Sequence, residues 1–362
     1  MKNHLLKQIF GIKYPIIQAP MAGGMTNPNL VSSVCNADAL GFLASGYVSA
    51  SVLEKQIIET KQKTQKPFGI NIFLSQTIQN LQAKKQSALI NLEKQAGLQN
   101  SSTQINVCLN EEIEQKIELA VKYGIPIISF TFGIPDQKLI KHMHSKGIHV
   151  IGTATNVQEA LEIEKANLDS VVLQGSEAGG HRGSFIIQDQ SDEIGLISLL
   201  QVAKKKLKIP YFAAGGIASG EALLSCRILG AQAAFIGTTF LVSHESSASR
   251  VYKDTLLKSQ GKETVITEVV SGKKARGVKN QLIEQMNKSA SMGEPIEPYP
   301  IQNALSKDIR AFCNQAGKSE YLSLWSGQSL ECIQENSVTD ILQKIIKEYE
   351  ESLQNIQKLS LQ

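Results

Sequence analysis

The sequence predicts an α/β fold, a (β/α)8 TIM barrel with a smaller cap domain on its C-terminal side. Short apolar segments alternate with helix-like stretches eight times within residues 1–241. Each apolar segment runs into a turn that contains Gly or Ser, and the remaining chain does not continue the repeat. A doubly wound sheet also alternates strands with helices, but eight repeats in this span fit a barrel best.

The eight predicted strands are short and mostly apolar, as expected for parallel strands that are buried on both faces. In chain order they are Pro15–Met21, Leu40–Gly46, Phe68–Leu74, Pro126–Phe132, His149–Ala154, Ser170–Gln174, Ile209–Ala214 and Ala233–Gly237.

The helices between these strands are predicted from their ends as well as their periodicity. Asn27 suits an N-cap, Pro28 suits a first turn, and Gly147 suits the residue that ends a helix. The predicted helices are 27–37, 51–61, 110–123, 136–146, 157–166, 193–207 and 219–229. A Gln- and Lys-rich excursion at 75–106 is longer than a plain connection, and we expect an extra helix at 77–96.

Residues 242–336 are predicted to form a smaller substrate or cap domain over one mouth of the barrel of residues 1–241. The C-terminal helix, within 337–362, carries one apolar stripe and should dock on the barrel. Within the cap we expect a helix at 245–259, a strand at 263–270 and a basic turn at 272–277.

Composition narrows the class of protein. The net charge of +4 comes from scattered Lys and Arg, so no nucleic-acid-binding surface is indicated. The five Cys are odd in number and lack C-x-x-C spacing, which argues against a disulfide framework or a zinc site. No apolar run approaches the roughly 20 residues that span a bilayer, and the N-terminus lacks the apolar segment of a signal peptide. We therefore expect a cytoplasmic protein that does not bind a membrane.

A glycine-rich loop follows the sixth predicted strand and combines an acid, an imidazole and a guanidinium: Glu177, His181 and Arg182. Its glycines, at 175, 179, 180 and 183, allow close approach of the backbone to a ligand. His181 is the natural candidate for proton transfer there. The alternative is a flexible surface loop in which His181 has no chemical role.

The seventh and eighth strands end in Gly215-Gly216 and Gly237-Thr238-Thr239. In a (β/α)8 barrel the loops after these two strands form the usual phosphate site, so the pair of motifs favours a phosphate-bearing ligand over two ordinary tight turns. The chain has no G-x-G-x-x-G after a strand and no G-x-x-x-x-G-K-[ST], so neither a dinucleotide nor an ATP-type site is indicated.

Met21 and Gln174 end other predicted strands, Asn71 lies within the third, and the three would surround the edge of a planar ring. Together with the phosphate site they are consistent with FMN, although Asn71 and Gln174 could equally be strand-end residues that bond locally. Phe130, Phe132 and Trp325 either wall this pocket or simply pack.

Several motifs together resemble the nitronate monooxygenases, formerly called 2-nitropropane dioxygenases. They are Gln18-Ala-Pro-Met-Ala-Gly-Gly24, Pro67-Phe-Gly-Ile-Asn71, Gly175-Ser-Glu-Ala-Gly-Gly-His-Arg-Gly183 and Ala214-Gly-Gly-Ile-Ala218. FMN-dependent enoyl-ACP reductases share these four motifs. The aromatic segment Ser129-Phe-Thr-Phe-Gly-Ile-Pro135, with Ser271–Gly277 and Leu324–Gln328, is similar to the class I monooxygenases instead.

The resemblance implies His181 as the catalytic residue, FMN as the cofactor and no metal. The implied FMN contacts are Met21, Asn71, Gln174, Gly179, Gly216, Phe235, Ile236, Gly237 and Thr238. Barrels similar to IMP dehydrogenase need a nucleophilic Cys after the sixth strand, and this chain has none there.

The implied activity is FMN-dependent oxidative denitrification of alkyl nitronates, such as propionate 3-nitronate, with O2 to a carbonyl compound and nitrite. Such a reaction would serve detoxification, in a monomer or homodimer. An NAD(P)H-dependent enoyl-ACP or quinone reductase on the same barrel is the first alternative. A flavin- or phosphate-binding protein without catalysis is the second.

Overall fold

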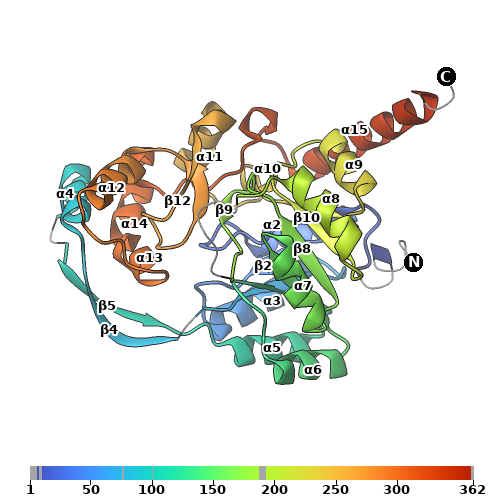
Figure 1. Ribbon diagram of the computed structural model, residues 1–362, viewed down its shortest axis with the longest axis horizontal. Helices are drawn as coiled ribbons and strands as arrows, with labels where there is room; N and C mark the ends of the chain where they lie inside the picture. Colours follow the sequence, from blue (N-terminus) through green and yellow to red (C-terminus); the bar gives the residue numbers. More distant parts are fainter. Residues whose placement is uncertain (1–5, 8–9, 76, 100, 187–192, 360–362) are drawn as a thin grey trace.

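Eight parallel strands form the barrel that the sequence predicts. The computed structural model describes residues 6–7, 10–75, 77–99, 101–186 and 193–359. A bridge between Ile17 and Leu40 joins the two ends of the eight-stranded sheet, which confirms the (β/α)8 barrel (Figure 1). In their order around the barrel the strands are β1 (Ile16–Gln18), β11 (Ala234–Ile236), β10 (Tyr211–Ala214), β8 (Ser170–Gln174), β7 (His149–Ala154), β6 (Ile127–Thr131), β3 (Gly69–Phe73) and β2 (Phe42–Ala44).

Helices connect the strands at or near the predicted positions. The Asn27 side chain accepts a hydrogen bond from Leu30 N at 2.8 Å and so caps the first of them, as expected. Gly147 follows its helix with φ 71°, the left-handed conformation that Gly adopts without strain. The connecting helices are α2 (Pro28–Asn36), α3 (Ala50–Lys63), α5 (Ile113–Tyr123), α6 (Gln137–Ser145), α7 (Val157–Lys165), α8 (Leu196–Lys206), α9 (Gly220–Ile228) and the short α10 (Thr238–Leu241).

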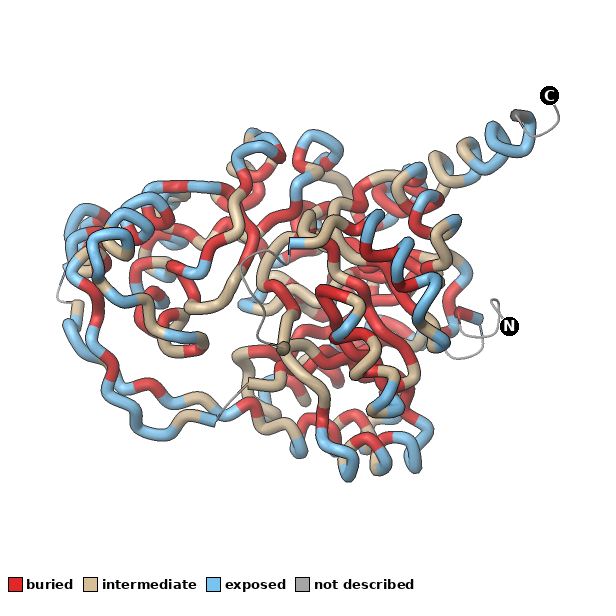
Figure 2. Tube along the Cα trace, in the orientation of Figure 1, coloured by how far each residue is buried: buried red, intermediate tan, exposed pale blue. Residues whose placement is uncertain are grey.

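Alternate residues of each strand face the barrel interior, because side chains alternate across a strand. The interior holds one apolar cluster, and Phe10 closes its lower end by stacking on Phe212 with ring centroids 5.6 Å apart. Figure 2 shows this buried core in red. Towards the carboxyl ends of the strands the same faces carry polar residues, Asn71 on β3, Thr131 on β6 and Gln174 on β8. The polar end of the barrel is therefore the end at which such folds bind ligands.

The excursion after β3 differs from the single helix predicted at 77–96. It forms an antiparallel hairpin of β4 (Ile78–Lys84) and β5 (Gln104–Leu109), with α4 (Ser87–Ala96) between the strands. Residues 78–84 are mostly exposed and lack an apolar face, so their pairing with β5, rather than their own periodicity, sets their conformation. Gly97 ends α4 with φ 91°.

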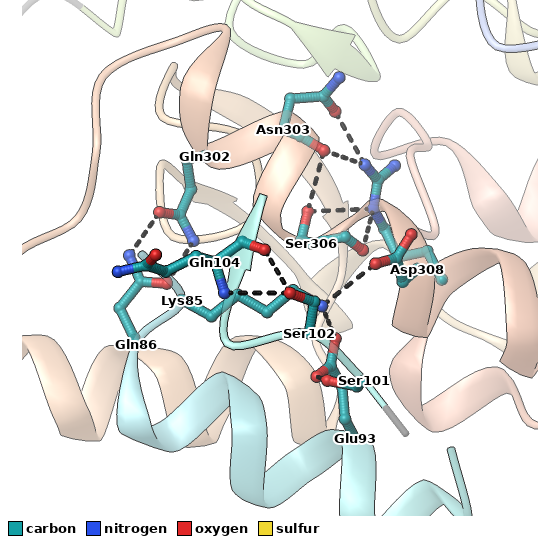
Figure 3. A network of polar contacts seen from close by, with 11 residues as sticks. Lys85, Gln86, Glu93, Ser101, Ser102, Gln104, Gln302, Asn303, Ser306 and Asp308 are labelled. Atoms are coloured by element: carbon teal, nitrogen blue, oxygen red, sulfur yellow. Dashed lines mark hydrogen bonds and ion pairs between the residues drawn. The ribbon is translucent and has the colours of Figure 1, made fainter. Parts of the chain in front are cut away.

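The hairpin carries α4 across to the helices of the predicted cap (Figure 1). The buried side chain of Lys85 anchors it there: Lys85 Nζ lies 2.6 Å from Glu93 of α4 itself and 3.1 Å from Asp308 of the cap (Figure 3). Beside it, Gln86 donates to the side-chain oxygen of Gln302 at 2.6 Å. The excursion is thus attached to residues more than two hundred positions away in the chain.

The region after α10 packs around a second apolar core that also includes Leu89 and Leu92 of α4. The predicted basic turn is partly a strand, β13, because residues 275–278 pair with both β12 and β9 (Gly180–His181). The predicted helix at 245–259 begins later, at Arg250, and the predicted strand at 263–270 is shorter. The main elements are α11 (Arg250–Lys258), β12 (Thr264–Thr267), β13 (Ala275–Val278), α12 (Gln281–Ser291), α13 (Ile301–Leu305) and α14 (Lys307–Gln315), with single 3-10 turns at Gly261–Glu263, Ser319–Tyr321 and Leu330–Cys332.

The last helix, α15 (Val338–Leu359), packs on α9 and α2. Its Ile341, Leu342 and Ile345 are buried in the barrel's outer core. We propose a division into a barrel of residues 1–241 joined by α15, and a cap of residues 242–336 that also takes up the excursion. Within the described part of the chain, no helix is long and apolar enough to cross a membrane.

Candidate active site

The glycine-rich loop after β8 is tied to its surroundings at several points. Arg182 is 3% exposed and donates to the carbonyl oxygens of Gly175 at 2.5 Å and Gln174 at 2.9 Å. The Glu177 carboxylate accepts from Leu196 N, the first residue of α8, at 2.9 and 3.0 Å. These contacts make the loop a built element of the fold rather than a free surface loop. Glu177 therefore helps to fix the position of the loop, because its carboxylate binds the start of α8.

His181 lies in β9, which pairs with β13 of the cap region, so strand pairing fixes its backbone. Its Nε2 lies 2.9 Å from the Ser271 hydroxyl, and that hydroxyl donates its hydrogen to the Lys273 carbonyl oxygen at 3.1 Å. The Ser271 oxygen therefore accepts from Nε2–H, which leaves Nδ1 as the ring nitrogen with a free lone pair. Burial, together with Lys273 and Arg310, lowers the pKa of His181 to about 3, so the imidazole is neutral at pH 7.

Aromatic rings surround His181. The centroid of its ring lies 5.9 Å from that of Phe132, 5.6 Å from that of Tyr299 and 5.6 Å from that of Trp325. Phe132 adopts φ 77°, a strained conformation for a bulky residue of the kind that concentrates at functional sites. Phe130, by contrast, is fully buried in the outer core, so it packs and does not wall the site.

The rings of Phe132, Tyr299 and Trp325 form an aromatic cage around His181. Two cations to which the sequence assigned no role, Lys273 and Arg310, lie near this cage. Lys273 Nζ lies 5.0 Å from the centroid of the Phe132 ring and donates to the Ser184 carbonyl at 2.8 Å. Arg310 donates to the side-chain and main-chain oxygens of Asn303 and Ser306. Burial lowers the pKa of both groups. No carboxylate of the described residues forms an ion pair with either, so the cage has positive charge to offer an anion.

The two candidate amides already have protein partners. Asn71 Nδ2 donates to Ser129 Oγ at 2.9 Å and Thr131 Oγ1 at 3.1 Å on β6. Gln174 donates to the carbonyl of His181 at 3.0 Å and accepts from Gly183 N at 2.8 Å, so its side chain holds the glycine loop. For Gln174 this is the local bonding that the sequence left open.

The ends of β1, β10 and β11 meet on one side of the barrel mouth. Gly216 has φ 66°, and Gly237 lies beside the β1 end, where an added Cβ would be 3.9 Å from Ala19 Cβ. Met21 holds the β1 loop through Thr26 Oγ1, which accepts from Met21 N at 3.0 Å. The side chains of Phe235 and Ile236 point instead into the inner and outer cores.

The residues present fit a bound flavin phosphate. Gly215 and Gly216 both have positive φ, so they leave room in a turn that side chains would strain. Thr239 Oγ1, in the short helix α10 after β11, is buried and has no hydrogen-bond partner among the described residues. A buried hydroxyl without a partner is unusual in a folded protein and is expected where a ligand supplies the partner. The polar inner layer at Asn71, Thr131 and Gln174 suits the edge of a flavin ring.

The sequence predicted that His181, Phe132 and Trp325 belong to one pocket. It gave no role in that pocket to Ser271, Tyr299 or Arg310. The basic turn that contains Lys273 was recognised, yet nothing in its spacing placed it beside His181, which is 92 positions earlier in the numbering. Arg310 carried no local signal, because its contact with the site depends entirely on how α14 packs.

The chain is similar to known proteins over nearly its whole length. Residues 3–348 match the family model described as nitronate monooxygenase. A probable nitronate monooxygenase of Staphylococcus haemolyticus is 38% identical over 350 residues, 96% of this chain and 97% of that protein. Another, from Staphylococcus saprophyticus, is 37% identical over 354 residues, 95% of this chain and 96% of that protein.

Two solved structures share the whole fold. Nitroalkane oxidase from Streptomyces ansochromogenes has a TM-score of 0.85 and 29% identity, covering 97% of this chain and 99% of that one. FabK from Thermotoga maritima has a TM-score of 0.77 and 26% identity, covering 98% of each chain. The chain belongs to the nitronate monooxygenase family of oxidoreductases.

Proposed function

We propose that the protein is an FMN-dependent nitronate monooxygenase that converts alkyl nitronates and O2 to a carbonyl compound and nitrite. One observation carries the proposal: a neutral His181 sits among aromatic rings and near two partly buried cations, Lys273 and Arg310, that form no ion pair with a carboxylate of the described residues. A nitronate is a small anion, and a water-poor cage with unpaired positive charge stabilises it more than it stabilises a neutral molecule.

The protein's own groups would act as follows. Lys273 and Arg310 attract the anion, while Phe132, Tyr299 and Trp325 exclude water around it. His181 Nδ1 carries the free lone pair and is the atom placed to accept the α-proton of a neutral nitroalkane. Its low pKa makes it a weak base, so an anionic nitronate, which needs no proton removed, is the preferred substrate. Ser271 is a positioning residue, because it fixes which nitrogen of His181 carries the proton.

FMN, when bound, would supply the acceptor of electrons from the nitronate. We propose that Asn71 and Gln174 lie along its ring, that Met21 and Gly179 border it, and that Gly216 and residues 235–238 hold its phosphate side. Phe235 and Ile236 would contribute through their backbones, because their side chains are used in packing. Their main-chain atoms remain beside Gly237 at the strand end.

A reductase that takes hydride from NAD(P)H remains a second candidate, because the FabK structure shares the fold over 98% of the chain. The deciding experiment is an absorbance spectrum of the purified protein, followed by oxygen uptake and nitrite release with propionate 3-nitronate. A flavin spectrum with nitrite released in step with substrate consumption supports the proposal. Flavin without turnover of any nitronate contradicts it and leaves the reductase and a flavin-binding protein as the candidates.

A further inference from the structure

A short segment of the cap, residues 325–329, lies across the loops that follow three barrel strands. Gln328 N donates to the carbonyl of Glu177, after β8, at 3.1 Å. Gly327 N donates to Thr238 Oγ1, after β11, at 3.0 Å. Ser329 Oγ donates to the carbonyl of Gly216, after β10, at 2.7 Å. The segment therefore bonds to the loops from which the phosphate site is expected.

This contact leaves no room for side chains. A Cβ added to Gly179 would lie 2.4 Å from the carbonyl carbon of Ser326 and 2.5 Å from Gly327 N. A Cβ added to Gly327 would lie 2.9 Å from the carbonyl oxygen of Glu177. Gly179 is therefore required for close approach of the cap backbone, a role distinct from the flavin contact implied by the sequence.

Ser326, in the middle of this segment, is 1% exposed, and its hydroxyl oxygen is buried without a hydrogen-bond partner among the described residues. Thr239 is 6% exposed, and its hydroxyl oxygen is likewise buried without a hydrogen-bond partner among the described residues. The two are linked through their chain neighbours, since Gly327 bonds directly to Thr238. The segments that carry these two hydroxyls meet at the bond between Gly327 and Thr238, and a ligand bound at this junction would supply the missing partners.

We propose that the Ser326 hydroxyl donates a hydrogen bond to the phosphate of FMN, with Thr239 as its counterpart from the barrel. This inference rests on the FMN binding proposed above. A phosphate dianion is a strong acceptor, so a hydroxyl that donates to it forms a charge-assisted bond. The cap then completes the cofactor site as well as the substrate cage, and bound FMN links the cap to the barrel.

The test compares Ser326→Ala with the wild type for binding of FMN and of riboflavin, which has the same ring but no phosphate. Apoprotein is titrated with each flavin, and the quenching of flavin fluorescence gives the dissociation constants. We expect FMN binding to weaken by about tenfold, the effect of one charge-assisted hydrogen bond, and riboflavin binding to stay unchanged. Unchanged FMN affinity, or equal weakening of both flavins, would overturn the proposal.

Two further variants keep the result independent of folding. Ser329→Ala removes a hydroxyl that already has a protein partner, so it should lower the melting temperature of the apoprotein, whereas Ser326→Ala should not. Thr239→Val should repeat the selective loss of FMN affinity, and a Thr239→Val protein with wild-type FMN affinity would contradict its part in the site.

The outcome also separates this inference from the proposed activity. A wild type that turns over nitronate, with a Ser326→Ala variant that binds FMN normally, contradicts only the role of Ser326. A selective loss of FMN affinity in a protein that never turns over nitronate supports Ser326 and contradicts only the activity.

Discussion

The side chains of His181 and Ser271 meet at 2.9 Å although they belong to different parts of the fold. The Ser271 hydroxyl gives its hydrogen to the Lys273 carbonyl, so the neutral imidazole keeps its proton on Nε2. One hydrogen bond thus links the glycine loop of the barrel to the cap and decides which nitrogen is available as a base.

His181→Asn should lower kcat/KM for a neutral nitroalkane by about 10²–10⁴-fold, the usual contribution of a positioned base. Flavin content should not change, because no flavin contact is assigned to the imidazole. Initial rates of nitrite release, with flavin absorbance per protein as the readout of loading, measure both. His244→Asn, at an exposed position, is the matched control. Full activity in His181→Asn would remove His181 from the chemistry.

Lys273→Met should raise KM for an anionic nitronate more than for a neutral nitroalkane, because it removes a partly buried cation and keeps most of the side-chain volume. It should also raise the pKa of His181, since Lys273 is one of the causes that lower it. Steady-state kinetics with the two substrates, each over a range of pH, check this. Lys274→Met is the neighbouring control. An equal change for both substrates would show that Lys273 does not select for charge.

The stability of the protein should fall as pH drops from 6.5 towards 3, partly through His181. Its folded pKa, about 3, is below the ordinary 6.5, so in this window the unfolded chain binds a proton that the folded protein does not. The contribution of neutral His181 to the free energy of unfolding is complete above pH 6.5. As the pH falls below 6.5, this contribution is lost at up to about 1.4 kcal/mol per pH unit. His181→Asn should flatten this dependence in urea unfolding at pH 7 and 5. An identical slope in the variant would contradict the low pKa.

Glu93→Gln should destabilise the protein by about 3–5 kcal/mol, because it leaves the Lys85 ammonium buried without its closest partner. Lys85 and Glu93 have side chains 0% and 1% exposed and both belong to the excursion, while the second contact of Lys85, with Asp308, fastens the excursion to the cap. The double variant Lys85→Met, Glu93→Leu should recover most of the loss, since no charge is then left buried. Chemical denaturation gives the free energy of unfolding of the wild type and both variants. A Glu93→Gln protein as stable as the wild type would show that the Lys85–Glu93 pair does not stabilise the fold.

The barrel could be predicted because most of its strands have a local signature, an apolar run followed by a turn that contains Gly or Ser. The β4–β5 hairpin could not, because its first strand is polar and largely exposed. What fixes it is pairing with β5 and attachment to the cap through Lys85, neither of which a local pattern contains.

The candidate site divides in the same way. His181 and the glycine ends of the strands could be found, because in this fold the carboxyl ends of the strands converge. Lys273, Tyr299 and Arg310 reach His181 only through the packing of the cap. Gly179 was expected to let the backbone approach a ligand, and the structure shows the cap backbone at Ser326 close to it.

Anaerobic mixing of the flavin-loaded protein with propionate 3-nitronate, and separately with NADH, tests the central claim most directly. The anion site beside a neutral His181 predicts rapid loss of oxidised-flavin absorbance with the nitronate and none on that timescale with NADH. Rapid flavin reduction by NADH, with no response to the nitronate, would contradict the monooxygenase and identify a reductase on the same barrel.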